Sequence, residues 1–184
     1  MSDTRVAVLV GSLRSDSLNR KLAETLKAHA PEGVTLDIVE GLADVPFYNE
    51  ELDAGQAPAA AAHLREQVAA ADAVLSVTPE YNGTMPAVLN NAIDWLSRPY
   101  GAGALVGKPF AVVGTTPTPY GGKWAHDDAN RSARIAGADV REHLTVSQSA
   151  IDTDVLGAEV VGRIIASIEG LVAQEAAEAT KSVA

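Results

Sequence analysis

Short apolar runs recur along the chain between longer segments of mixed polarity. Continuous runs of β-forming apolar residues are typical of strands that are buried on both faces of a sheet. Two such runs occur, at residues 6–10 and 110–113, and residues 73–77 match them except at Ser76. Residues 34–39 and 140–146 contain more polar side chains, and this pattern predicts strands nearer the edges of the sheet.

The segments between these runs carry apolar residues three or four positions apart, which predicts amphipathic helices. Leu18, Leu22 and Leu26 show this spacing in the first segment. Pro58 and Pro86 mark the starts of the next two helices, since proline is favoured in a first helical turn. The predicted helices lie around residues 18–26, 58–68, 86–96, 122–135 and 160–168.

Strands and helices thus alternate, and this pattern predicts right-handed βαβ crossovers and a parallel, doubly wound sheet. The first, third and fourth runs are the most apolar, which favours central positions for them. The strand order 2-1-3-4-5 satisfies that ranking. We therefore predict an α/β fold of the flavodoxin-like type, a three-layer sandwich around a five-stranded parallel sheet. No repeat or linker divides the sequence, so residues 1–184 are interpreted as one domain.

The loop after the first predicted strand, residues 11–21, combines serines with cations. In a sheet of this order, ligands bind outside the carboxyl ends of the strands, near the point where the strand order reverses. The serines and Asn19 offer side-chain donors at the start of a helix, where backbone N–H groups lack partners. The pattern favours an anion such as a phosphate at this helix N-terminus.

The charges of this loop support the same interpretation. Its cations are Arg14, Arg20 and Lys21. They face a single carboxylate, Asp16, although the chain as a whole is acidic. Cations in the first turn of a helix oppose its dipole by about 0.3–1 kcal/mol each, and a bound phosphate would reverse that effect. The alternative is that Ser17 caps the helix and the basic side chains point into solvent.

Three common phosphate sites are excluded by their motifs. The chain has no GxxxxGKS or GxxxxGKT sequence, so it has no Walker A nucleotide site. No GxGxxG follows the first strand, so the dinucleotide-binding fingerprint is absent. A receiver domain shares the predicted sheet order but needs carboxylates beside the end of its first strand, where residues 9–11 supply none.

The loop after the third predicted strand, residues 78–86, suits a flat ligand. Pro79 stiffens it, and Gly83 lets the backbone approach a ring closely. Tyr81 can lie against an aromatic ring or cover a subunit contact. The pair formed by Asn82 and Gly83 is typical of hairpin turns, but the helix predicted next leaves no second strand, so we expect no hairpin turn here.

Three stretches together resemble the NADPH-dependent FMN reductase family, and within it the bacterial quinone and chromate reductases. They are Gly-Ser-Leu-Arg…Ser-Leu-Asn at 11–19, Pro-Glu-Tyr-Asn…Pro…Asn-Ala-Ile-Asp-Trp at 79–95, and Gly-Lys-Pro at 107–109. The stretches are spread over most of residues 5–150, in the order and spacing of that family. The second stretch is the most specific of the three.

The resemblance implies a flavodoxin-like fold that binds FMN. The phosphate would lie on the first loop and the isoalloxazine ring on the second, and a third loop would contact the flavin through Thr115. Pro117 and Pro119 in the third loop stand where relatives often carry small residues, and they reduce its donors. The cofactor-binding residues that the resemblance implies are Ser12, Leu13, Arg14, Ser17, Leu18, Asn19, Pro79, Glu80, Tyr81, Asn82, Gly83 and Thr115.

The implied activity is that of an FMN-dependent NAD(P)H oxidoreductase. A hydride passes from NADPH or NADH to the bound flavin, and the electrons then leave to a quinone, chromate, azo or flavin acceptor in a ping-pong cycle. No catalytic side chain is expected, because the flavin performs the chemistry. The partners are therefore small-molecule electron acceptors.

Two other classes of function remain open. A flavodoxin-type electron carrier would bind FMN without turning over NAD(P)H. Arg14 and Arg20 disfavour it, because the phosphate loops of such carriers tend to lack arginine. A phosphate-ligand sensor or a structural protein with an empty loop would bind no flavin at all.

The predicted helix at 86–96 carries more apolar side chains than one buried stripe needs. The alternative is burial on both sides within one domain, and Trp95 is interpreted as core packing. The resemblance also implies homodimers or homotetramers, and we predict an isologous dimer through this helix and residues 79–85. The apolar side chains are Val88, Leu89, Ala92, Ile93, Trp95 and Leu96.

Composition narrows the range of partners. A net charge of −10 disfavours general binding to nucleic acid or to anionic membranes. The sequence contains no cysteine, which excludes disulfides, thiolate metal sites and a cysteine nucleophile, and which is compatible with a cytoplasmic protein. His29, His63, His126 and His143 lack metal-ligand spacing, so no metal site is expected and all four are interpreted as ordinary surface residues.

Overall fold

A parallel sheet forms the centre of the chain. The structure is a computed structural model that describes residues 3–182, without the side chains of residues 174–182. Within these residues the strands are β1 (Thr4–Val10), β2 (Val34–Ile38), β3 (Ala73–Val77), β4 (Pro109–Thr116), β5 (Asp139–Val140) and β6 (Val146–Ser149). They follow the order β2-β1-β3-β4-β5, and β6 also pairs with β4. The predicted fold class and strand order are confirmed.

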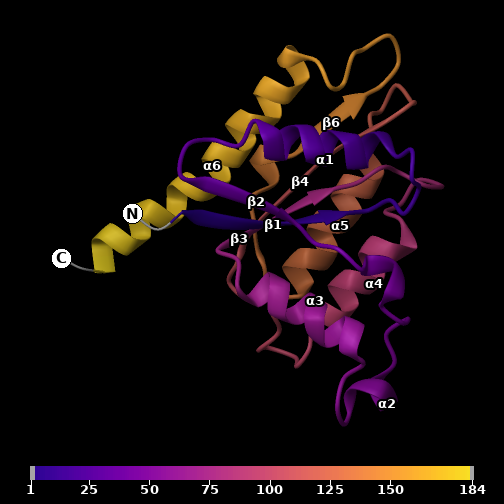
Figure 1. The fold of residues 1–184 in the computed structure, drawn as a ribbon, viewed down its shortest axis with the longest axis vertical. Helices are drawn as coiled ribbons and strands as arrows, with labels where there is room; N and C mark the ends of the chain where they lie inside the picture. Colours follow the sequence, from indigo (N-terminus) through magenta and orange to yellow (C-terminus); the bar gives the residue numbers. More distant parts are fainter. Residues whose placement is uncertain (1–2, 183–184) are drawn as a thin grey trace.

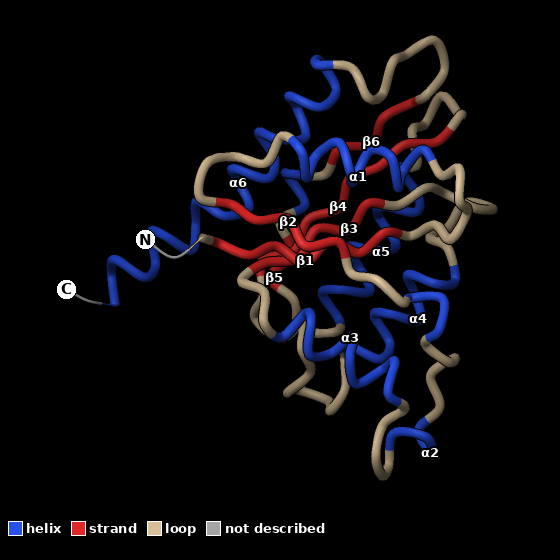
Figure 2. The backbone as a smooth tube through the Cα atoms, in the orientation of Figure 1, coloured by secondary structure: helices blue, strands red, loops and turns tan. Residues whose placement is uncertain are grey.

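Helices cover both faces of the sheet. Figure 1 shows α1 and α6 on one side of it and α3 and α4 on the other, and Figure 2 shows the strands as a layer between these groups. The helices are α1 (Leu18–Ala28), α2 (Glu50–Asp53), α3 (Ala59–Ala69), α4 (Ala87–Leu96), α5 (Lys123–Ile135) and α6 (Ala158–Ser182), with 3₁₀ turns η1 (Leu42–Asp44) and η2 (Glu142–Leu144).

The side chains of β1 alternate between two cores. Val6, Val8 and Val10 pack with residues of α1 and α6. Ala7 and Leu9 pack with residues of α3, α4 and α5. Burying a valine or leucine side chain stabilises a fold by roughly 1.5–3 kcal/mol, so a strand between two helical layers has no position that favours a polar residue. This explains the continuous apolar run.

The prediction of one continuous strand at residues 140–146 is wrong, because the structure has two short strands there. β5 pairs with the start of β4, and β6 pairs with its end. Phe110 and Val113 of β4 lie opposite Val140 and Val146. The chain thus advances by three residues in β4 between these two pairs, but by six residues in the edge segment. The extra residues leave the sheet in the η2 turn. A polar edge segment can do this because only one neighbouring strand holds it.

The long connection between β2 and α3 is fastened to α4. Asn91 accepts a hydrogen bond from the Tyr48 N–H at 2.8 Å and donates to the Pro46 carbonyl at 3.0 Å. The Trp95 indole N–H donates to the same carbonyl at 2.7 Å. Trp95 is fully buried, which confirms its predicted core role. The Asn-Ala-Ile-Asp-Trp motif thus anchors a loop as well as filling the core.

No helix within residues 3–182 combines the length and the apolarity needed to cross a bilayer.

Candidate cofactor site

Three loops meet at the carboxyl ends of β1, β3 and β4, on the right of Figure 1. They are residues 11–17, 78–86 and 117–122. β3 lies between β1 and β4, so the loop that follows it is flanked by the other two. All twelve residues that the family resemblance implies lie on these loops, at the start of α1 or at the end of β4.

Asn19 ties the first loop to the third. Its side chain is buried, its amide nitrogen donates to the Thr115 carbonyl at 2.9 Å, and its oxygen accepts from the Thr115 N–H at 3.0 Å. Both side-chain groups of Asn19 are therefore used within the protein. Only its backbone N–H remains to face a ligand, and the side chain sets the spacing between α1 and β4.

Two glycines let the three strand ends approach at backbone distance. A Cβ atom at Gly114 would lie 2.0 Å from the Thr78 carbonyl oxygen, and one at Gly11 would lie 2.2 Å from the Thr78 hydroxyl. No other residue type fits at either position without displacing Thr78. Gly114 was missed by sequence reasoning, although a glycine inside an otherwise apolar strand is the signal of such an approach.

The N-terminus of α1 presents free donors. Ser17 caps the helix, because its hydroxyl accepts from the Arg20 N–H at 3.2 Å. Within the described residues, the N–H groups of Leu18 and Asn19 have no hydrogen-bond partner. Unpaired N–H groups at the positive end of a helix dipole form a site for an anion.

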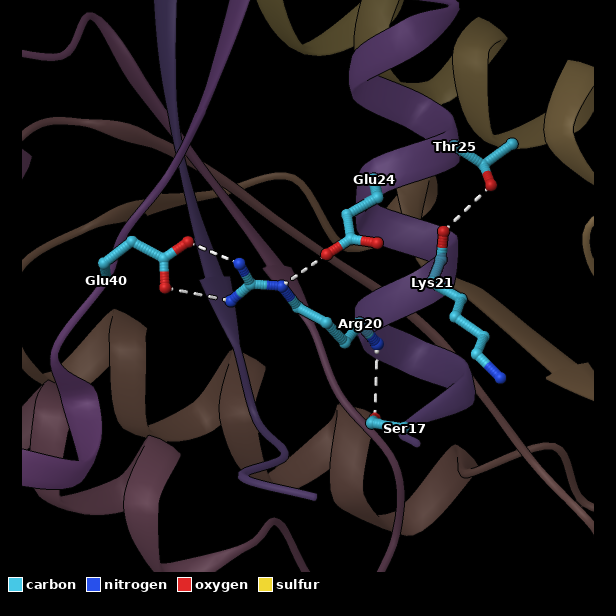
Figure 3. A network of polar contacts seen from close by, with 6 residues as sticks. All are labelled: Ser17, Arg20, Lys21, Glu24, Thr25 and Glu40. Atoms are coloured by element: carbon cyan, nitrogen blue, oxygen red, sulfur yellow. Dashed lines mark hydrogen bonds and ion pairs between the residues drawn. The ribbon is translucent and has the colours of Figure 1, made fainter. Parts of the chain in front are cut away.

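The cations of the first loop are mostly neutralised, and the prediction that they face only Asp16 is wrong. The Arg20 guanidinium lies between Glu24 and Glu40, as Figure 3 shows, and donates to them at 2.9 and 3.1 Å. Its hydrogen bonds with Glu40 raise the pKa of Arg20 and lower that of the Glu40 carboxyl. Lys21 is paired with Asp16.

Arg14 differs from these two cations. Its side chain is exposed, and among the described residues it has no ion pair. It lies with Ser12 and Leu13 in the wall of a hollow between the first loop and residues 39–44. Arg14 is thus the cation of this loop whose charge is available to a ligand.

The second loop contains a tight turn that we did not expect. Tyr81 and Thr84 exchange two backbone hydrogen bonds of 3.0 and 3.1 Å, and Asn82 and Gly83 between them have φ angles of 53° and 74°. Positive φ at both central residues is the requirement of a type I′ turn. The expectation that no hairpin turn forms is wrong, because a single residue pair closes the turn before Pro86 leads into α4.

Contacts at both ends hold this turn in place. The Glu80 carboxylate accepts from the N–H groups of Trp124 and Ala125 at 3.1 and 3.3 Å, in the first turn of α5. The Tyr81 hydroxyl lies 3.4 Å from the Ser12 hydroxyl, on the first loop. The backbone N–H groups of Asn82 and Gly83 have no partner within the described residues, so they remain available to a ligand.

His126 is buried, so its interpretation as a surface residue is wrong. Its Nε2 lies 3.1 Å from the Thr78 carbonyl oxygen and its Nδ1 2.7 Å from the Ser147 hydroxyl. A carbonyl only accepts, so Nε2 carries the proton and donates to Thr78. Helical spacing from Ala129 and Ala133, both buried on the same face of α5, is the signal that could have placed His126 inside.

Burial lowers the pKa of His126, and this predicts a pH dependence of stability. The nearby carboxylates of Glu80 and Asp127 act in the opposite direction but are smaller causes. An unfolded histidine titrates near pH 6.5, so below that pH the unfolded chain binds a proton that the folded chain lacks. The free energy of unfolding should fall as the pH drops below about 6.5, by at most about 1.4 kcal/mol per pH unit.

Urea unfolding of wild type and His126→Gln between pH 5 and pH 8 would measure this effect. Glutamine keeps one donor and one acceptor but does not titrate. The variant should lose the part of the slope between the unfolded and folded pKa values of His126. Equal slopes for the two proteins would show that His126 does not supply the dependence.

The available groups fit a phosphorylated flat ligand. Arg14 and the N–H groups of Leu18 and Asn19 supply charge and donors for a phosphate. The buried Thr115 hydroxyl has no hydrogen-bond partner within the protein, and it lies at the end of β4 beside this edge. An orphaned buried hydroxyl of this kind is expected where a ligand completes the site.

Comparison with known proteins identifies the ligand class. Residues 4–151 match the family model described as NADPH-dependent FMN reductase. The chain belongs to the NADPH-dependent FMN reductase family. As a member of this family it is an NAD(P)H-dependent oxidoreductase with FMN as its cofactor.

Relatives and solved structures agree with this membership. A quinone reductase of Pseudomonas putida is 49% identical over 127 residues, which cover 69% of this chain and 68% of that protein. A 2-hydroxy-1,4-benzoquinone reductase of a Burkholderia species is 46% identical over 112 residues, or 61% and 60% of the two chains. FerB, a flavoenzyme NAD(P)H:(acceptor) oxidoreductase from Paracoccus denitrificans, superposes with a TM-score of 0.79 at 32% identity, over 91% of this chain and 97% of FerB.

Proposed function

We propose that this member of the FMN reductase family is an NAD(P)H:quinone oxidoreductase. The cofactor part of the proposal is carried by the free N–H groups of Leu18 and Asn19 at the start of α1, and by Arg14, the cation of the preceding loop that has no ion pair among the described residues. The quinone part is supported by relatives that are named quinone reductase. Chromate, azo compounds and free flavin are further acceptors that we propose on chemical grounds, since an exposed flavin can reduce each of them.

We assign the binding roles as follows. Arg14 and the backbone N–H groups at the start of α1 hold the phosphate, and Ser17 and Asn19 contribute by fixing that helix end. The N–H groups of Asn82 and Gly83 donate to the polar edge of the ring. The complete proposed binding set is Ser12, Leu13, Arg14, Ser17, Leu18, Asn19, Pro79, Glu80, Tyr81, Asn82, Gly83 and Thr115.

The residues of this chain bind and orient the cofactor and the substrates, and none of them is assigned as an acid or a base. When bound, FMN accepts a hydride from NAD(P)H and passes the electrons on to the acceptor. Glu80 is the carboxylate on the loop of residues 78–86, which we call the ring loop, and it is occupied in capping α5. Because NAD(P)H is a cytoplasmic electron donor, we also propose that the protein acts in the cytoplasm.

Steady-state kinetics with NADPH and NADH against a panel of acceptors would test this function. The panel contains a naphthoquinone, chromate, an azo dye and free FMN. One ring face that serves both substrates requires the oxidised nicotinamide to leave before the acceptor binds. Double-reciprocal plots should therefore be parallel. Intersecting lines would contradict the ping-pong part, and failure of both nicotinamides to support turnover would contradict the enzyme.

The proposed dimer rests on a smaller surface than the sequence suggested. Apart from Val88, the apolar side chains named for α4 are buried in the core of this chain, so their number is explained within one protomer. A hollow lined by Tyr81, Met85, Ala87 and Asn90 lies between the ring loop and the start of α4. We propose that a second copy covers this hollow across a two-fold axis.

Ala87→Arg should dissociate this dimer. A charge buried at the centre of an isologous contact meets its own copy, so we expect the mass from light scattering at micromolar concentration to fall to that of a monomer and turnover to fall about tenfold or more. Ala59→Arg is the matched control, since both alanines are exposed first residues of helices preceded by a proline. A monomeric wild-type protein with full activity would contradict the proposal.

A further inference from the structure

Exposed aromatic side chains gather beside the ring loop. Tyr120 and Trp124 are 57% and 48% exposed, and their ring centroids lie 4.6 Å apart with the planes tilted by 46°. Tyr81, on the neighbouring turn, is 43% exposed. The core of the chain uses none of these three rings, although only eight aromatic residues are present. Large rings left in solvent at the rim of a site indicate a binding surface.

The backbone that carries Tyr120 and Trp124 is held in one conformation. Gly121 and Gly122 between them have φ angles of 63° and 94°, which favour glycine. A Cβ at Gly121 would lie 2.7 Å from the backbone of Ser147, so the loop lies directly against β6. The Lys123 N–H also donates to the Tyr120 carbonyl at 3.2 Å. The two rings are therefore presented by a fixed backbone.

Direct contacts place this pair next to the loop that we assign to the isoalloxazine ring. Glu80 accepts from the Trp124 N–H at 3.1 Å. One helical turn later, Asp128 accepts from the Thr84 hydroxyl. Trp124 and Asp128 are four residues apart and share one face of α5, so this face runs along the turn formed by residues 80–84.

The charges around Trp124 favour a neutral ligand over an anion. Lys123 is paired with Asp127 at 2.6 Å, and Arg131 is paired with Asp128. The remaining carboxylate is Glu80, which is bound to the helix end. An incoming oxyanion therefore finds no unpaired cation among these groups and one excess negative charge. A neutral flat ring, by contrast, can pack against the apolar faces of the Tyr120 and Trp124 rings.

We propose that Tyr120 and Trp124 form an aromatic wall that determines acceptor specificity, by binding the ring of a quinone beside the flavin. This inference rests on the proposed function and adds to it the residues that favour an aromatic acceptor over a small oxyanion. Stacking against a fixed aromatic pair contributes to affinity beyond the area buried. The wall acts on acceptor binding, so it is not required for holding FMN.

The test compares Trp124→Ala and Trp124→Phe with wild type, each loaded with FMN. Equilibrium binding of 2-methyl-1,4-naphthoquinone to the oxidised protein is measured by calorimetry, which does not depend on turnover. The protein is then reduced with dithionite and mixed with the naphthoquinone or with ferricyanide, a non-aromatic oxidant. Tyr100→Ala is the matched control, because Tyr100 is 86% exposed but lies in the connection that leads to the start of β4.

Trp124→Ala should weaken naphthoquinone binding and raise the concentration for half-maximal reoxidation by about 5- to 20-fold. Trp124→Phe should stay within about threefold of wild type, and Tyr100→Ala should be unchanged. Reoxidation by ferricyanide should be the same in all four proteins. Wild-type naphthoquinone affinity in Trp124→Ala would overturn the inference, as would loss of the dimer in that variant, which would make the rings a subunit contact.

These measurements, taken together with the steady-state kinetics with NAD(P)H, distinguish this inference from the proposed function. Dithionite replaces NAD(P)H in the experiment, so acceptor binding is measured even in a protein that no nicotinamide reduces. Failure of NAD(P)H with an intact difference between the variants would contradict the proposed function alone. Reduction by NAD(P)H without that difference would contradict the aromatic wall alone.

Discussion

Arg14→Ala is expected to weaken FMN binding by about 1.5–3 kcal/mol, the scale of one hydrogen bond to a charged group. Arg14 is the cation of the first loop that has no ion pair among the described residues, so its charge is free for the phosphate. Riboflavin lacks the phosphate and should bind wild type and variant equally. Calorimetric titration of the flavin-free proteins with both ligands measures the two differences.

Lys21→Ala is the matched control for this prediction. It removes the same charge from the neighbouring first turn of α1, but Lys21 is already paired with Asp16. We expect FMN affinity to change by less than about 0.5 kcal/mol in this variant, as for an exposed ion pair. Equal losses in the two variants would mean that only the summed charge of the loop matters, and wild-type affinity in Arg14→Ala would place the phosphate elsewhere.

Asn19→Ala is expected to lower the free energy of unfolding by about 2–5 kcal/mol. The substitution leaves the buried N–H and carbonyl of Thr115 without partners, and each such group costs roughly 1–3 kcal/mol. FMN affinity should fall as well, because the side chain of Asn19 sets the spacing between α1 and β4. Urea unfolding gives the first quantity and titration with FMN the second.

Asn49→Ala provides the comparison. Asn49 is an exposed asparagine whose side-chain oxygen accepts one hydrogen bond, from the Glu51 N–H at 2.9 Å, as the cap of the short helix α2. Its loss should cost at most about 1 kcal/mol and leave FMN affinity unchanged. If Asn19→Ala is no less stable than Asn49→Ala, the bridge to Thr115 does not hold the site together.

The fold could be predicted because burial on both faces restricts the central strands to apolar residues. β1, β3 and β4 are covered on both sides, so residues 6–10, 73–77 and 110–113 are apolar at every position except Ser76, and the runs stand out in the sequence. The edge strand was predicted as one piece because its polar residues carry no such constraint. Pairing with a single neighbour allowed the three-residue η2 turn to interrupt it.

The candidate site could be predicted as a set of loops but not as a set of contacts. Segment order brings Arg14, Asn19 and Tyr81 to one edge of the sheet, and this follows from topology alone. The partner of a polar side chain depends on distances across the fold. For that reason the ion pairs of Arg20, the use of Glu80 as a helix cap and the burial of His126 could not be predicted from their neighbours in the sequence.

The central claim is that this chain binds FMN and passes electrons to it from NAD(P)H. Anaerobic stopped-flow mixing of the FMN-loaded protein with NADPH, and separately with NADH, tests it most directly. We predict that at least one nicotinamide bleaches the visible flavin absorption in a single turnover, and that a naphthoquinone restores it. A yellow protein that neither nicotinamide bleaches would be an electron carrier, and a protein that stays colourless after addition of FMN would have no flavin site; either result would contradict the account.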